Sequence, residues 1–120
     1  MKQAFLIIGH GSRLKEGNQD FDNIIHQVIK HHPEALIYGA HMAHAQPSIE
    51  TQVNRLYHQE VRKIIIIPYF LYGGSHIKQR IPSLLEQLCT KLPGLSYEIK
   101  PTLNQNPAVI KALSENITDQ

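Results

Sequence analysis

The sequence of 120 residues contains no tryptophan, a single cysteine and no long apolar run. Because Cys89 stands alone, it cannot form a disulfide within the chain, and this fits a reducing compartment. The apolar stretches are shorter than the roughly 20 residues of a membrane-spanning helix, and the first, residues 4–8, is too short for a secretory signal. We therefore expect a cytoplasmic protein with no membrane partner.

Charge of either sign is also sparse. The chain has 12 Lys and Arg against 10 Asp and Glu, for a net charge of +2, and the basic residues are scattered. Nucleic-acid-binding surfaces usually gather Lys and Arg on one face, so we expect no nucleic-acid partner. A hydrophobic content of 42% over this length is sufficient for one globular domain, which we assign to residues 1–120.

The hydrophobic pattern predicts four strands that alternate with four helices. Short apolar runs bounded by glycine or proline predict strands at residues 4–8, 35–40, 64–67 and 96–100. Apolar residues at helical spacing predict a helix after each strand, with these boundaries: an N-cap at Asn18, a start at Pro47, a short turn and then a main helix near Pro82, and a start at Pro107.

This order predicts an α/β fold, a single doubly wound parallel sheet of order 2-1-3-4 with helices on both faces. Such sheets bind ligands outside the carboxyl ends of the strands where the order reverses, here between the first and third strands. His10 follows the first strand and His76 follows the third, and each has glycines beside it. The topology therefore brings together two histidines that lie 66 positions apart.

Two imidazoles at this edge suit metal chemistry. Neutral imidazole binds divalent Fe, Co, Ni, Cu and Zn, and it is also a base near neutral pH. Without a carboxylate or thiolate the pair is an incomplete cage, which favours transient holding of a metal over a closed structural site. Four other histidines fall on the surfaces or ends of predicted helices and need no such role: His26, His31, His32 and His58.

Groups that bind anions and flat ligands surround the predicted site. Ser12 and Arg13 near the first crossover, together with Ser75 and Lys78 near the third, suit an anionic ligand. The aromatic residues of the loop before His76 either line an apolar slot for a flat ligand or pack at the sheet edge: Tyr69, Phe70 and Tyr72.

Four motifs occur in the order and spacing of one family: His10-Gly11-Ser12-Arg13, Gln46-Pro47-Ser48-Ile49, Ile66-Ile67-Pro68-Tyr69-Phe70-Leu71, and Gly74-Ser75-His76-Ile77 followed by Ile81-Pro82. From the first strand to Pro107, the chain resembles the small, half-length class II chelatases of the CbiX/SirB type. These are lyases that insert a divalent metal into sirohydrochlorin.

The resemblance implies a mechanism and an assembly. His10 and His76 would bind the incoming Co²⁺, Ni²⁺ or Fe²⁺ and accept the pyrrole protons, with no tightly bound cofactor. A homodimer is implied because longer relatives contain two such halves. The substrate would be a flat tetrapyrrole with eight carboxylates, made into a cobalamin or sirohaem precursor. Its binding residues would be Ser12, Arg13, Tyr69, Phe70, Gly74 and Ser75.

The chain departs from the family pattern at two places. Relatives commonly carry M-E-x-A-E-P-S after the second strand, where this chain has Ala43 and Gln46 at the acidic positions, and His44 is a candidate replacement ligand. Relatives also often have an acidic pair at the position of Gln79-Arg80.

Two other functions stay open on the sequence. One is a non-catalytic carrier of a metal or tetrapyrrole. The other is phosphoryl transfer by a histidine, although histidine phosphatases place Arg directly before the histidine, where this chain has Gly9.

Overall fold

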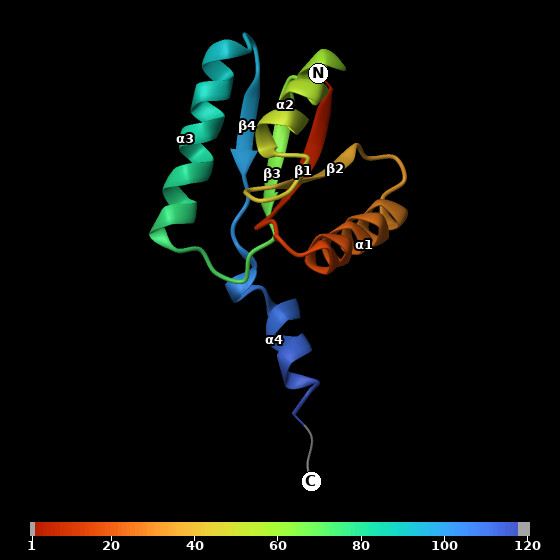
Figure 1. The fold of residues 1–120 in the computed structure, drawn as a ribbon. Helices are drawn as coiled ribbons and strands as arrows, with labels where there is room; N and C mark the ends of the chain where they lie inside the picture. The colour runs from red at the N-terminus through yellow and green to blue at the C-terminus, as the bar shows by residue number, and fades with distance from the viewer. Residues whose placement is uncertain (1, 118–120) are drawn as a thin grey trace.

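A four-stranded parallel sheet forms the centre of the molecule (Figure 1). The computed structural model describes residues 2–117, apart from the side chains of residues 75–77 and 105. The strands are β1 (Gln3–Gly9), β2 (Ile37–His41), β3 (Lys63–Pro68) and β4 (Ser96–Ile99). Their order is β2-β1-β3-β4, which confirms the predicted topology. The two central strands, β1 and β3, carry the longest apolar runs because both of their faces are covered.

Three helices cover the sheet, and a fourth projects from it. The helices are α1 (Lys15–His31), α2 (Ile49–His58), α3 (Ser75–Lys91) and α4 (Pro107–Ser114), with a short 3-10 helix, η1 (Leu103–Gln105), before the last. The larger core cluster joins the sheet to α2 and α3 on one face, and a smaller one around Phe21 and Ile25 joins it to α1 on the other. Below the carboxyl ends of the strands, α4 extends away from the body (Figure 1).

The start of α1 differs from the prediction. Asn18 is not its N-cap, because the helix begins at Lys15 and Leu14 occupies the cap position without a side-chain hydrogen bond. The Asn18 amide instead bonds both backbone groups of Ser12, accepting from its N–H at 2.9 Å and donating to its carbonyl at 2.9 Å. Asn18 thus fixes the preceding loop, one turn after the helix has begun.

The predicted start of α2 and the predicted break in α3 are also wrong. α2 begins at Ile49, and Ser48 rather than Pro47 precedes it as the N-cap, with its Oγ accepting from the Thr51 N–H at 3.1 Å. α3 runs unbroken through Pro82. Proline removes one helical hydrogen bond. Ile81 and Leu85, at 2% and 1% exposure, anchor the helix to the sheet on both sides of it.

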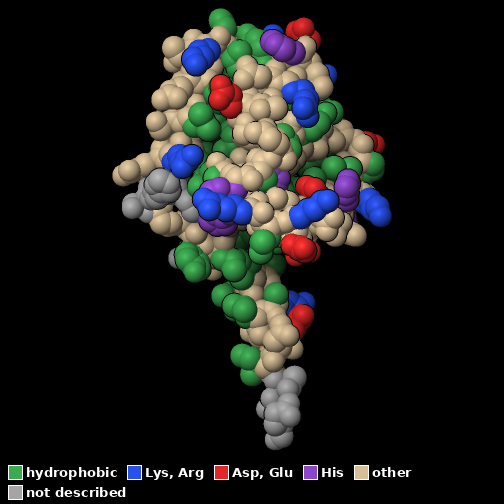
Figure 2. All heavy atoms as spheres, viewed as in Figure 1, with side chains coloured by type: hydrophobic (Ala, Val, Ile, Leu, Met, Phe, Trp, Pro, Cys, Tyr) green, Lys and Arg blue, Asp and Glu red, His purple; other side chains and the backbone are tan. Residues whose placement is uncertain are grey.

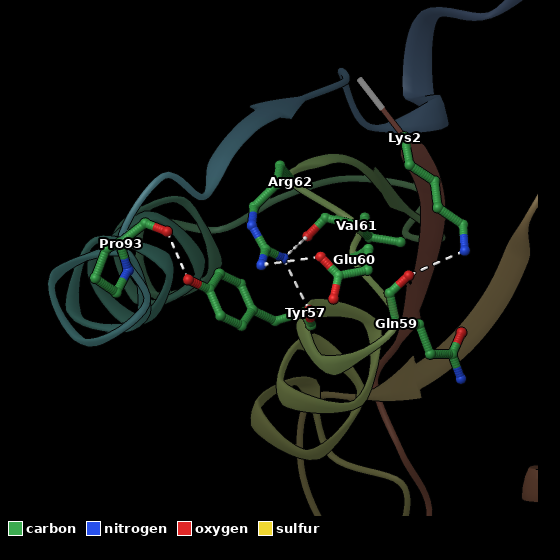
Figure 3. A network of polar contacts seen from close by, with 7 residues as sticks. All are labelled: Lys2, Tyr57, Gln59, Glu60, Val61, Arg62 and Pro93. Atoms are coloured by element: carbon green, nitrogen blue, oxygen red, sulfur yellow. Dashed lines mark hydrogen bonds and ion pairs between the residues drawn. The ribbon is translucent and has the colours of Figure 1, made fainter.

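The amino ends of the strands are held by a polar network around Arg62 (Figure 3). The Arg62 guanidinium lies 3.7 Å from the centroid of the Tyr57 ring and donates to the Tyr57 carbonyl at 2.8 Å. The Tyr57 hydroxyl donates to the Pro93 carbonyl at 2.6 Å, and Lys2 Nζ donates to the Gln59 carbonyl at 2.9 Å. These contacts join two connections, α2 to β3 and α3 to β4, to the start of β1 at the amino ends of the strands.

Within residues 2–117, no helix has both the length and the apolar character needed to cross a membrane.

Candidate functional site

The loop that carries His10 is fixed by the loop after β2. The Met42 N–H donates to the Gly9 carbonyl at 2.8 Å, and the Ala43 N–H donates to the His10 carbonyl at 3.1 Å. Gly11 has φ of +85°, and a Cβ placed there would lie 1.7 Å from the Ala43 carbonyl oxygen. Only glycine fits this contact. The turn therefore requires a glycine directly after His10.

His10 lies at the carboxyl end of the sheet with its ring against Phe70. The two ring centroids are 4.1 Å apart. Phe70 is only 2% exposed, so it is a fixed platform, whereas His10 is exposed. Phe70 thus supports this imidazole and also lines the cavity beside it, where a role in binding a flat ligand remains a prediction.

Two cavities meet at His10. The larger, of about 630 Å³, is lined by the loop after β3: Tyr69, Phe70, Leu71, Tyr72 and Gly74. Among the described residues, and apart from its chain neighbours, no atom lies within 4 Å of a Cβ built on Gly74. The smaller, of about 270 Å³, lies between the His10 loop and α1, and Tyr69 borders both. A ligand in either cavity therefore meets His10.

Some of the polar groups predicted near His10 form hydrogen bonds with neighbouring residues of the loops. Ser12 Oγ accepts from the Leu14 N–H at 3.0 Å and keeps its own proton to donate. Arg13 Nε donates to His44 Nδ1 at 3.3 Å, and both side chains are exposed. Because a guanidinium can only donate, this contact requires a neutral His44 imidazole. His44 lines neither cavity at His10. Figure 2 shows Lys, Arg and His side chains in a band across this part of the molecule.

His41 borders the site and lies one position beyond the strand predicted at residues 35–40. It is instead the last residue of β2, pairs in register with Gly9, and is 3% exposed. Its ring lies 5.0 Å from that of Phe21 and borders the smaller cavity. Burial lowers the pKa of His41, against an opposing effect of the Asp22 carboxylate, and its buried Nδ1 has no hydrogen-bond partner among the side chains that the structure describes. The signal in the sequence that could have pointed to His41 was its position at the end of a predicted strand.

The other predicted imidazole, that of His76, lies outside the described side chains, as does the hydroxyl of Ser75. Their backbone forms the first turn of α3, directly after Gly74. This places residue 76 at the same edge of the sheet as His10, since α3 follows β3 and β3 pairs with β1. Among the side chains that the structure describes, no three His, Cys, Asp or Glu residues form a group able to hold a metal ion.

The family model named CbiX matches residues 4–120. The chain belongs to the CbiX family. Among its curated relatives, the chloroplastic sirohydrochlorin ferrochelatase of Arabidopsis thaliana is 27% identical over 114 residues, which are 95% of this chain and 51% of that protein. The sirohydrochlorin cobaltochelatase of Methanothermobacter thermautotrophicus is 38% identical over 86 residues, or 70% of this chain and 58% of that one.

Solved structures of CbiX-type proteins share the fold. A putative cobalamin biosynthesis CbiX protein from Marinobacter aquaeolei matches with a TM-score of 0.84 at 25% identity, over 94% of this chain and 92% of that chain. SirB from Bacillus subtilis, solved with Fe³⁺, matches with a TM-score of 0.87 at 25% identity, over 96% of this chain but 46% of that one. The matched part of this CbiX family member covers about half to two thirds of the length of these curated relatives.

Proposed function

We propose that this chain is a sirohydrochlorin chelatase that inserts Co²⁺, Ni²⁺ or Fe²⁺ into the macrocycle, acting in the cytoplasm as a homodimer of single-domain chains with no tightly bound cofactor. The observation that carries the proposal is the position of His10. Its imidazole stands on a buried aromatic platform at the mouth of a cavity with aromatic walls, in a chain whose named relatives are sirohydrochlorin chelatases.

The reaction exchanges two protons for one metal ion. Sirohydrochlorin loses both pyrrole N–H protons, and its nitrogens take the divalent metal in their place. His10 and His76 would hold the metal from opposite sides of the crevice and accept these protons, because neutral imidazole serves both purposes. A site with two protein ligands leaves open the coordination positions to which the macrocycle nitrogens must bind.

The walls of the larger cavity suit a flat ligand with acidic side chains. Tyr69, Leu71 and Tyr72 are 37%, 56% and 78% exposed, so their apolar surface is available to a macrocycle. Gly74 leaves room for close approach, and the exposed Arg13 guanidinium suits a carboxylate. Ser12 and the Ser75 hydroxyl would add hydrogen bonds to the same substrate.

Position 43 offers no carboxylate, so the two imidazoles carry the metal largely alone. We assign His44 a minor role, because its Nδ1 accepts from Arg13 and its ring lines neither cavity. Metal preference then follows imidazole chemistry and availability, and all three metals suit it.

The test is an anaerobic absorbance time course of sirohydrochlorin with each metal, in the presence and absence of protein. We expect the wild type to accelerate insertion, His10→Ala and His76→Ala to lose at least about 100-fold in rate, and His26→Ala, on the exposed surface of α1, to match the wild type. Full activity in either site variant removes that residue from the mechanism. Saturable sirohydrochlorin binding without acceleration by any metal identifies a carrier instead.

A further inference from the structure

A further cavity opens beside the two that meet at His10. It has a volume of about 330 Å³ and lies between the first turns of α3 and the segment that follows β4. Its apolar walls are formed by Pro68, Ile81, Pro82, Ile99 and Pro101. The exposed lysines Lys78 and Lys100 also line it, and no Asp or Glu does so among the described residues. This cavity, the α3–β4 groove, suits an acid group on a short apolar stem.

The two lysines of the α3–β4 groove differ in the charge that they offer. Lys100 Nζ lies 2.8 Å from Glu98 Oε2, so its charge is already compensated by a neighbour on β4. The Lys78 ammonium has no hydrogen-bond or ion-pair partner among the side chains that the structure describes. Lys78 is therefore the cation that a ligand in the groove would meet.

The loop after β3 borders both the groove and the larger cavity at His10. Gly73 lines the groove, and the next residue, Gly74, lines the larger cavity. A Cβ built on Gly73 would lie 3.5 Å from Thr102 Cγ2 and 3.9 Å from Lys78 Cγ, so this loop packs against both sides of the groove. A ligand that fills the larger cavity thus has the groove directly beside it.

The spacing of the strands matches the size of a tetrapyrrole. The groove lies between the last residues of β3 and β4, Pro68 and Ile99. Neighbouring strands are about 4.8 Å apart, so this point is roughly 7 Å to the side of β1, which His10 follows. The carboxylates of a tetrapyrrole stand on short stems at the rim of the ring, roughly 7 Å from its metal by ordinary bond lengths. A macrocycle with its metal at His10 can therefore place one carboxylate in the groove.

We propose that the α3–β4 groove binds one peripheral carboxylate of the macrocycle, with Lys78 as its cation and the apolar walls around its stem. The ammonium gives this carboxylate a charge-assisted hydrogen bond. The contact lies at the rim of the ring, away from the nitrogens that exchange protons for metal, so Lys78 should affect substrate binding and not the insertion step. The inference rests on the proposed function, because it takes the substrate from it.

The first test measures binding without catalysis. Metal-free uroporphyrin, which carries eight carboxylates, is titrated with protein and followed by its fluorescence. We expect Lys78→Ala to raise the Kd about 5-fold, the loss of one partly exposed ion pair, and Lys78→Arg to restore it. Lys91→Ala, at an exposed lysine about 20 Å away along α3, should match the wild type. Equal Kd values for Lys78→Ala and Lys91→Ala overturn the proposal.

The second test locates the carboxylate. A water-soluble carbodiimide joins a bound carboxylate to a neighbouring amine as an amide. After coupling to uroporphyrin, peptide mapping should find the porphyrin on Lys78 at several times its level on Lys91. Coupling at the two lysines to the same extent overturns the proposal, because it would show that the porphyrin has no preferred position at the groove.

The third test uses metal insertion into sirohydrochlorin to separate this proposal from the proposed function. Lys78→Ala should raise KM about 5-fold and leave kcat unchanged, because the ion pair is the same before and during insertion. A wild type that inserts no metal, but whose uroporphyrin binding is weakened by Lys78→Ala, refutes the chelatase and leaves the groove. An active enzyme whose KM is unchanged by Lys78→Ala refutes the groove alone.

Discussion

Replacing Gly11 with alanine tests how the His10 loop is held. Gly11 has φ of +85°, and Gly94, in the turn before β4, has φ of +84°. Alanine in this left-handed region costs about 1–2 kcal/mol at either position, and restriction of the unfolded chain returns about 0.5 kcal/mol. Gly94→Ala meets nothing closer than Arg62 Cδ at 3.8 Å, so about 1 kcal/mol is its whole effect.

At Gly11, a steric clash adds to the free-energy cost of the left-handed backbone conformation. The new Cβ would lie 1.7 Å from the Ala43 carbonyl oxygen, so one loop must move. The movement disturbs the two backbone hydrogen bonds that join Met42 and Ala43 to the His10 loop, each worth about 1 kcal/mol. We therefore expect Gly11→Ala to lower the free energy of unfolding by about 3 kcal/mol, roughly 2 kcal/mol more than Gly94→Ala.

Urea unfolding followed by circular dichroism, at one protein concentration for all variants, measures both changes. The matched backbone angles cancel the cost of the left-handed conformation, and the remaining difference is the contact with Ala43. Equal destabilisation by the two substitutions would refute the reasoning, because it would show that the two loops do not constrain each other. We also expect Gly11→Ala to slow metal insertion, since His10 moves with the loop, whereas Gly94→Ala should not.

Two further predictions concern His41 and the cap of α2. Burial holds the folded-state pKa of His41 below its usual 6.5, so protonation favours the unfolded chain, and stability should fall as pH drops through about 6.5. In the wild type, the urea concentration at the unfolding midpoint should decrease between neutral and mildly acid pH. His41→Gln should make this decrease smaller, whereas His58→Gln, at an exposed position, should leave it unchanged. Ser48→Ala removes the side chain that accepts from the Thr51 N–H and should cost about 1 kcal/mol in the same urea assay, against little change for Ser83→Ala on the exposed side of α3. An unchanged midpoint for Ser48→Ala would show that this bond does not stabilise the fold.

The order of the strands was predictable because each strand is marked by its own residues. The four isoleucines of β3 show no polar alternation, as expected of a central parallel strand, and β1 extends one residue beyond each end of the predicted strand at residues 4–8. With the order known, residues 10 and 76 were expected at the same edge of the sheet, because both follow neighbouring parallel strands. The edge proposed for the site was therefore predictable from the pattern.

Local boundaries and burial were harder to predict because they depend on contacts between distant segments. Asn18 is a good N-cap by residue type, yet its amide is taken by the Ser12 backbone six positions earlier. The burial of His41 follows from its register with Gly9 and from the ring of Phe21 above it. The apolar residues of α4 predicted a helix but not its projection away from the sheet (Figure 1).

The contact between Gly11 and residue 43 separates the position of the His10 imidazole from the charge of the side chain at residue 43. Two contacts of Ala43 with the His10 loop are made by backbone atoms: its carbonyl oxygen faces Gly11, and its N–H bonds the His10 carbonyl. Neither contact uses the side chain at position 43, so both remain when that side chain is a methyl or a carboxylate. A sequence can in this way alter the charge offered to a metal through one codon, with no compensating change in the loops that form the crevice.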